Sequence, residues 1–115
     1  MQIDQELLIV MKGAEVAHAE ADLAEKLTDL FFKVLGEGNR LPGRIIFLGT
    51  GVFLTTEGSS QIERLEALAE RGVEIVSCIT CLTYYGRMDK VLVGRKGDMK
   101  DTVGSMVAAG RVVTI

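Results

Sequence analysis

The feature that most constrains the fold of this 115-residue chain is a regular alternation of short apolar runs with longer amphipathic segments. The first run, residues 7–11, reads Leu-Leu-Ile-Val-Met, a pattern typical of a strand buried on both faces. In the next segment, residues 17–35, apolar side chains recur from Leu23 onwards at the spacing of one helix face. Because the alternation continues to the end of the sequence, we expect an α/β fold. Its sheet should be mostly parallel, with about four to five strands and helices on both faces.

The remaining elements follow from the same patterns and from local start signals. In chain order we expect a strand at 45–48, a helix at 60–71, a strand at 73–76, a short helix near 80, a helix at 98–109 and a strand at 112–115. Ser60 and Glu63 have the spacing of a capping box, and Asp98 is suited to cap the last helix. Two segments are less regular: residues 52–54 would extend a strand, and residues 90–93 would form a short one.

Composition argues against several classes of function. A formal net charge of −3 does not suit nucleic-acid binding, because phosphate binding requires a basic surface. Only 5% of the residues are aromatic and none is Trp, which argues against a base-stacking platform. No apolar run approaches the ~20 residues of a membrane span, and the amino-terminal sequence lacks the basic region of a signal peptide. We therefore expect one domain over residues 1–115, cytoplasmic, with no nucleic-acid or membrane partner.

Both cysteines lie in one short stretch, residues 76–86, which reads VSCITCLTYYG. Four interpretations are open: a redox pair, half of a metal site, a sulfur-carrying nucleophile, or two small buried residues. Cys78 comes where the third strand should end, and in open parallel sheets ligands bind outside the carboxyl ends of strands. Free amides at the start of the next helix would stabilise a thiolate there. We expect Cys78 to be the working thiol, whereas Cys81, beside Leu82, suits a buried packing role better.

A metal or cofactor site is the weakest of these interpretations. Two cysteines supply two ligands where structural zinc requires four, and His18, which we expect to be solvated, is distant in sequence. The glycines of segment 49–51 do not complete a dinucleotide fingerprint, and segment 94–97 lacks the Lys-Ser or Lys-Thr of a phosphate loop. No metal and no cofactor is expected. The basic side chains of residues 87–100 should instead favour an anionic sulfur at Cys78.

Two segments of the sequence resemble the DsrE/DsrF-like sulfur-relay family. They are LTTEGS at residues 54–59 and GVEIVSCITCLTYYG at residues 72–86, and the likeness extends over nearly the whole chain. It is strongest to the C-terminal domain of YedF proteins. The resemblance implies a three-layer α/β/α fold, a homo-oligomer, and transfer of sulfur or selenium as a persulfide. In relay members the carrier cysteine precedes a glycine by eight residues, as Cys78 precedes Gly86 here.

The resemblance also implies roles for neighbouring residues. Cys81 matches a second cysteine of many relatives, which would resolve the persulfide. Ile79 stands where close relatives have glycine. YedF proteins carry an N-terminal TusA-like domain that this sequence does not show, so either the domain acts alone or its partner is a separate polypeptide. A separate sulfur donor or acceptor would be a TusA-like carrier or a cysteine desulfurase. The residues expected to line the site are Thr55, Thr56, Ser59, Thr80 and Arg87.

We therefore expect a sulfurtransferase-like sulfur carrier with Cys78 and Cys81 as its catalytic residues. Two other classes stay open. One is a thiol-disulfide redox protein that uses the same pair, although the Trp and cis-Pro surroundings of thioredoxin-like enzymes are missing and the only proline is Pro42. The other is a non-enzymatic oligomeric interaction module whose cysteines are structural.

Overall fold

The computed structural model describes residues 3–115 and contains a five-stranded sheet in the order β4-β3-β2-β1-β5. Every neighbouring pair of these strands is parallel. The strands are β1 Ile3–Met11, β2 Leu41–Phe47, β3 Glu74–Cys78, β4 Arg95–Gly97 and β5 Arg111–Thr114. The α-helices are α1 Ala21–Glu37, α2 Ile62–Glu70, α3 Ile79–Tyr84 and α4 Met99–Ala108, and two 3-10 helices are η1 Val16–His18 and η2 Gly49–Leu54. The expected α/β class and the mostly parallel sheet are confirmed.

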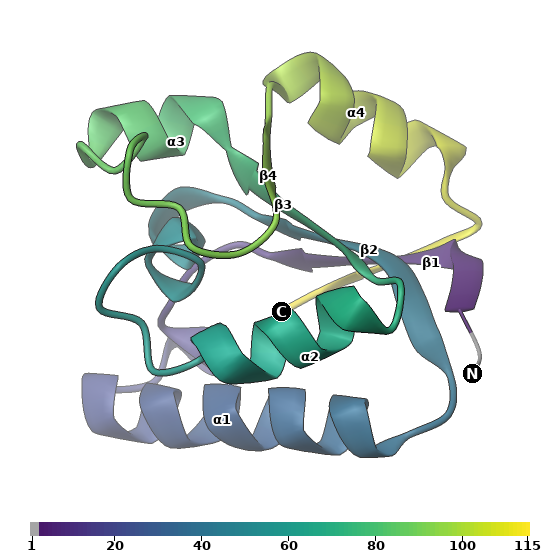
Figure 1. Cartoon of the computed structure of the whole chain (residues 1–115), viewed down its shortest axis with the longest axis horizontal. Helices are drawn as coiled ribbons and strands as arrows, with labels where there is room; N and C mark the ends of the chain where they lie inside the picture. Colours follow the sequence, from purple (N-terminus) through teal and green to yellow (C-terminus); the bar gives the residue numbers. More distant parts are fainter. Residues whose placement is uncertain (1–2) are drawn as a thin grey trace.

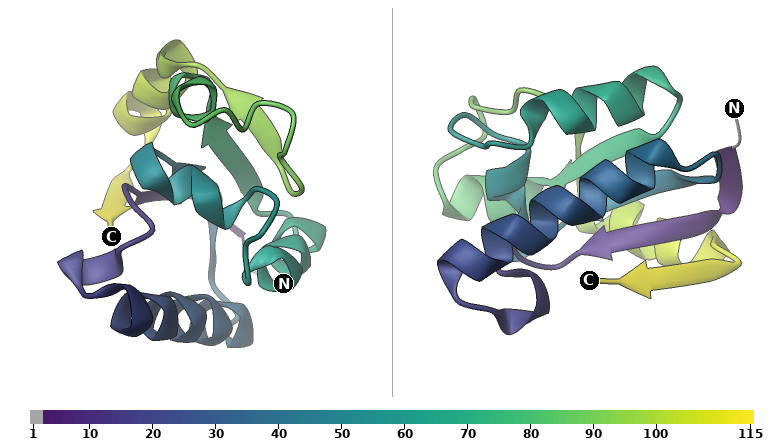
Figure 2. Two further views of the ribbon diagram at one scale, coloured as in Figure 1. Left: turned by 90° about the vertical axis from the view of Figure 1, so that its left-hand side faces the viewer. Right: turned by 90° about the horizontal axis from the view of Figure 1, so that it is seen from below.

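Helices lie on both sides of the sheet. Figure 1 shows α1 and α2 below the sheet and α3 and α4 above it, and the right-hand view of Figure 2, from below, shows α1 in front of the strands. The larger hydrophobic core joins one sheet face, with Ile9, Ile45 and Ile75, to Phe32 of α1 and Leu65 of α2. Because strand side chains alternate between faces, the residues next to these form the second core.

The second core is small. It consists of four buried strand residues, packed against partly buried Leu48 and Ala109, and these four are Leu8, Val10, Ile46 and Val76. On this side of the sheet, α4 contacts β1 and β4. The sheet is therefore covered more thinly on the α4 side than on the side of α1 and α2.

Two irregular segments differ from the prediction, and glycines give the reason in both. Residues 52–54 belong to η2 and do not extend β2, because the chain turns at Gly49, whose φ of 56° is left-handed, and then passes Gly51 close to the Met11 carbonyl. The predicted strand at 90–93 is also wrong: Val91 makes only an isolated antiparallel bridge to Thr56. The chain joins β3 only after Gly94, which lies so close to Ile75 that a Cβ there would clash with the Ile75 carbonyl.

Helix starts were predicted with mixed success. The Asp98 side chain accepts a hydrogen bond from the Asp101 amide at 2.9 Å and caps α4, as predicted. The predicted capping box at residues 60–63 is wrong: α2 begins after Gln61, whose amide donates to Ser59 Oγ at 3.0 Å. None of the helices within residues 3–115 has both the length and the apolar character needed to cross a bilayer. The expectation about a signal peptide rests in part on residues 1–2, which lie outside the described residues.

Candidate functional site

Cys78 is the last residue of β3 and the residue immediately before α3. It therefore lies at the carboxyl edge of the sheet, where parallel α/β sheets bind ligands. Its Cα still pairs with Gly97 of β4, so the sheet continues beside it. The side chain is only 1% exposed and belongs to the larger core together with Leu82 of α3.

Cys81 lies one turn further along α3 and is partly exposed. Its Sγ accepts a hydrogen bond from the backbone amide of Gly49 at 3.0 Å. Gly49 has a left-handed backbone, and a Cβ at this position would lie 3.1 Å from the Lys12 carbonyl. The amide that faces the sulfur is therefore held by a loop conformation that favours glycine.

The expected order of accessibility is reversed. The sequence suggested an accessible Cys78 and a packed Cys81, whereas the structure buries Cys78 and leaves Cys81 partly exposed. The reason is that pairing with β4 persists to the last residue of β3, so the end of this strand does not coincide with the protein surface. Both thiols are free, and they remain neighbours on one helical turn.

The surroundings raise the pKa of the Cys81 thiol above its ordinary value. Burial is the largest cause, and hydrogen bonding with the Cys78 thiol acts in the same direction. The Gly49 amide acts the other way, since it stabilises the thiolate. Negative charge on the Cys78 sulfur would also disfavour the Cys81 thiolate. Nucleophilic attack by Cys81 requires that its proton be removed first.

Thr55 and Thr56 lie in this region, but neither reaches its surface. Both are fully buried. The Thr55 hydroxyl lies 2.6 Å from Ser77 Oγ, and the Thr56 hydroxyl donates to the Val52 carbonyl at 2.9 Å. The Thr55 hydroxyl thus ties the end of η2 to the β3 residue directly before Cys78, whereas the Thr56 hydroxyl bonds back to η2 itself.

Arg87 also has a structural role, because its side chain contacts the loop that follows η2 and an aromatic ring. Its Nη1 donates to Thr56 Oγ1 at 3.0 Å and to the Glu57 carbonyl at 2.9 Å. The guanidinium lies over the Phe53 ring, 4.6 Å from its centroid, in a cation–π contact. The Phe53 ring in turn lies 4.8 Å from that of Tyr85. Arg87 therefore contacts Thr56, Glu57 and the Phe53 ring, and it makes no hydrogen bond to either thiol.

The other expected residues lie in different surroundings. Ser59 lines a separate small hollow with residues of α1 and accepts the Gln61 amide. Thr80 stands between the two cysteines on α3 and is exposed. Arg95, from the basic loop, pairs with Glu74 at 2.6 Å and with Asp101 at 2.7 Å. The structure therefore places Thr80 between the two cysteines at the start of α3, and the observed partners of Arg87 and Arg95 do not include the sulfurs.

Sequence reasoning missed Gly49, the residue whose amide faces Cys81. The available signal is the Gly-Thr-Gly stretch directly after an apolar run, which does not complete a dinucleotide fingerprint and so points to no site. Backbone amides leave no other trace in a sequence, since any residue carries one. Within the described range 3–115, no group of three or more His, Cys, Asp or Glu side chains is arranged to hold a metal ion.

Comparison with known proteins identified similar structures but no similar sequences. No protein-family model and no curated protein matches the sequence. Among solved structures, the ychN protein from E. coli is similar, with a TM-score of 0.66 and 18% identity, over 97% of this chain and 100% of its own. MTH1491 from Methanobacterium thermoautotrophicum, described as a protein of unknown function, is similar with a TM-score of 0.67 and 14% identity over the same shares. The chain shares their fold, and the expected α/β architecture with a parallel sheet is confirmed.

Proposed function

We propose that this protein carries sulfur as a persulfide on its Cys78–Cys81 pair. The observation that supports this most directly is the partly exposed Cys81, whose sulfur accepts the Gly49 amide one helical turn after the buried Cys78 at the carboxyl edge of the sheet. The DsrE-like fold and the sequence resemblance agree with this function. Neither one establishes it, because one fold supports many functions.

The burial of the two thiols suggests separate roles. Cys81 would meet the donor: its thiolate attacks the outer sulfur of a donor persulfide, the donor's S–S bond breaks, and the donor leaves as a thiolate. Cys78 would then attack the outer sulfur on Cys81 and release the Cys81 thiolate. The sulfur would end on the buried residue, where water and competing thiols have little access. A cysteine desulfurase or a TusA-like carrier has the chemistry required of a donor, and reversal of these steps would deliver sulfur to an acceptor.

Loading with labelled sulfur tests this proposal. The protein is incubated with a cysteine desulfurase and ³⁵S-cysteine, and both thiols are analysed by peptide mass spectrometry. Wild type should gain one sulfur, mainly at Cys78. Cys81→Ser should load poorly, and Cys78→Ser should hold label only on Cys81 and lose it faster. Equal loading of wild type and Cys81→Ser would reject the entry role, and absence of label from wild type would reject sulfur transfer. Selenocysteine in place of cysteine tests selenium as the cargo.

A redox function is the second candidate, and the position of the thiols favours it. Two free cysteines three residues apart, at the start of one helix, can be oxidised to a disulfide by an external disulfide. The products of the two functions differ in the mass of the protein. A persulfide adds one sulfur to the protein, whereas an internal disulfide removes two hydrogens. Equilibration with mixtures of reduced and oxidised glutathione, followed by intact mass measurement, distinguishes them.

A further inference from the structure

A second hollow lies at the point where the sheet reverses its strand order. From β1 the chain adds β2, β3 and β4 in one direction, and then returns through α4 to place β5 on the opposite edge of β1. In open parallel sheets, ligands bind outside the carboxyl ends of the strands at this reversal. The reversal lies between β1 and β5, and a hollow of about 730 Å³ is located there. This volume is within the range of small-molecule sites.

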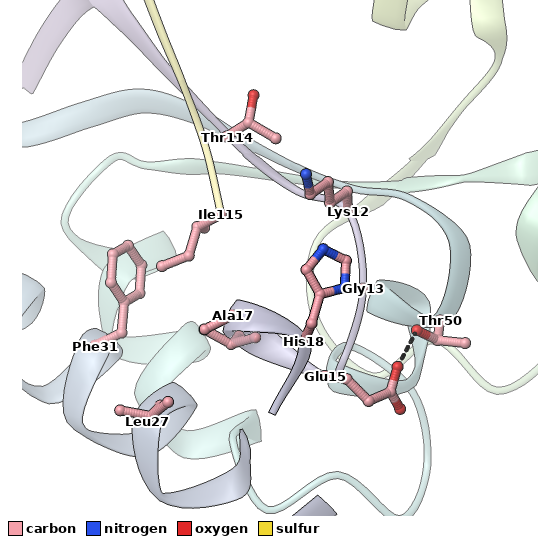
Figure 3. Close-up of a pocket in the computed structure, with 11 residues that line it drawn as sticks. Lys12, Gly13, Glu15, Ala17, His18, Leu27, Phe31, Thr50, Thr114 and Ile115 are labelled. Carbon is pink, nitrogen blue, oxygen red and sulfur yellow. Dashed lines mark hydrogen bonds between the residues drawn. The ribbon is translucent and has the colours of Figure 1, made fainter. Parts of the chain in front are cut away.

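The hollow has an apolar side and a polar side. Figure 3 shows Leu27, Phe31 and Ile115 on one side, and Lys12 and His18 on the other. The apolar residues come from α1 and from the end of β5, while the polar ones come from the loop that follows β1. A ligand that fits this arrangement has an apolar body and one polar end.

The hollow is lined by one ammonium, from Lys12, and one carboxylate, from Glu15. The Glu15 carboxylate is directed at Thr50, whose hydroxyl donates a hydrogen bond to it at 3.1 Å, as Figure 3 shows. Between residues 3 and 115, the side chains of Lys12 and His18 make no salt bridge or hydrogen bond. An ammonium and an imidazole N–H are therefore left to bind a ligand.

The loop that carries His18 has an unusual backbone. Ala17 and His18 have φ values of 62° and 55°, so two consecutive residues other than glycine adopt the left-handed conformation. This conformation is costly for residues with a Cβ, and such outliers occur often at ligand sites. In this structure it places the imidazole beside Lys12, as Figure 3 shows.

We propose that this hollow binds a small organic carboxylate with an apolar aliphatic or aromatic body. A carboxylate carries one negative charge, which one ammonium neutralises while the imidazole donates a hydrogen bond. A phosphate dianion is usually held by more donors, such as several backbone amides at a helix N-terminus. The apolar side of the hollow would also remain unused by inorganic phosphate.

The proposed site is distinct from the thiol pair but adjoins it. Thr50 lines the hollow and accepts the Ala14 amide at 2.9 Å, and its neighbour Gly49 contacts Cys81. The inference goes beyond sulfur transfer, and carboxylate binding does not require either cysteine. The double variant Cys78→Ser/Cys81→Ser should therefore bind the carboxylate as wild type does.

Titration of the ¹⁵N-labelled protein with sodium hexanoate tests the site, with 1-hexanol and inorganic phosphate as matched probes. We expect saturable amide shifts concentrated in residues 12–18 and 114–115. Hexanol and phosphate should each bind about tenfold more weakly or worse, because each lacks one half of the ligand. Shifts of equal size with hexanol would overturn the role of the charge, and tighter binding of phosphate would overturn the carboxylate class.

Lys12→Gln and Lys26→Gln provide the variant and its control. Lys26 is an exposed lysine of α1 that does not line the hollow. Lys12→Gln should weaken hexanoate binding about tenfold and leave hexanol binding unchanged, whereas Lys26→Gln should change neither. Equal affinities of the two variants for hexanoate, or no saturable hexanoate binding by wild type, would reject the proposal.

Discussion

At the scale of single residues, the environment of Cys81 has a measurable consequence. Burial and the neighbouring Cys78 thiol raise the pKa of Cys81, so its thiolate should form at a higher pH in the folded protein than in the unfolded chain. The rate of Cys81 alkylation by iodoacetamide, followed by peptide mass spectrometry, should therefore reach its half-maximal value above about pH 8.5, the value for a free cysteine.

The variant Cys78→Ala separates the two causes. It removes the contribution of the neighbouring thiol but leaves burial, which is larger, so the midpoint should fall only part of the way towards that of the denatured protein. Sulfur loading at Cys81 should follow the same pH profile. A midpoint in the native protein below that of the denatured protein would show that the Gly49 amide outweighs burial.

Gly49 provides a second test at this scale. Gly49→Ala would place a side chain on a left-handed backbone, 3.1 Å from the Lys12 carbonyl. We expect the free energy of unfolding to fall by about 1–2 kcal/mol, and Cys81 to react more slowly because its amide donor moves. The control is Gly104→Ala in α4, where a Cβ meets nothing within 4 Å. This substitution should stabilise the protein by about 0.5–1 kcal/mol in urea denaturation. Similar results for both variants would contradict the role assigned to Gly49.

At the scale of elements, the apolar runs predicted the main strands because a strand buried on both faces tolerates few polar residues. The predictions of elements were wrong where backbone conformation and backbone contacts, rather than side-chain pattern, determine the structure. The turn at Gly49, the close approach of Gly94 to Ile75 and the start of α2 all depend on contacts between segments distant in sequence. The pairing of Cys78 with Gly97 has the same origin, and for this reason both cysteines were found but their order of accessibility was not.

A network of ion pairs connects the start of β3 to α4. Arg44 and Arg95 both bind Glu74 and Asp101, at distances between 2.5 and 3.5 Å. Since these side chains are partly exposed, we expect Arg95→Gln to lower the free energy of unfolding by only about 1 kcal/mol at pH 7. Lys96→Gln, an exposed neighbour, is the control and should have little effect. Equal stability of the two variants would show that the network contributes nothing measurable.

The same network predicts how stability depends on pH. Hydrogen bonds from Arg95 lower the pKa of Asp101; for Glu74, burial raises the pKa, but the two arginines outweigh it and lower it overall. Stability from a lowered carboxyl pKa is present above the unfolded value, near pH 4, and is lost as the pH falls through the folded value. The difference in stability between wild type and Arg95→Gln should therefore shrink below about pH 4 in urea titrations. A constant difference down to pH 2 would contradict this origin.

At the scale of the whole molecule, α4 has its apolar side facing outwards. Its inner face carries Asp101, buried Thr102 and Ser105, whereas its outer face carries an exposed apolar stripe. The stripe recurs at i, i+4, i+7 and i+8, and consists of Met99, Val103, Met106 and Val107. Beyond α4, every residue of the edge strand β5 is exposed, including Val112 and Val113. An apolar face of this kind in a small domain is typical of an interface.

We propose that copies of the chain associate through this stripe. Size-exclusion chromatography with light scattering should then give a mass that is a multiple of the 12.5 kDa chain. The double variant Val103→Asp/Val107→Asp should reduce the mass to that of one chain, because two carboxylates would have to be buried in the interface. Val34→Asp, on the exposed side of α1, should leave the mass unchanged. Because the inner face of α4 makes polar contacts with its own domain, an aspartate on the outer face should change the free energy of unfolding of the monomer little. A fall in mass would therefore report loss of the interface and not unfolding. A wild-type protein that stays at 12.5 kDa at every concentration would exclude the stripe as an interface between copies of this chain.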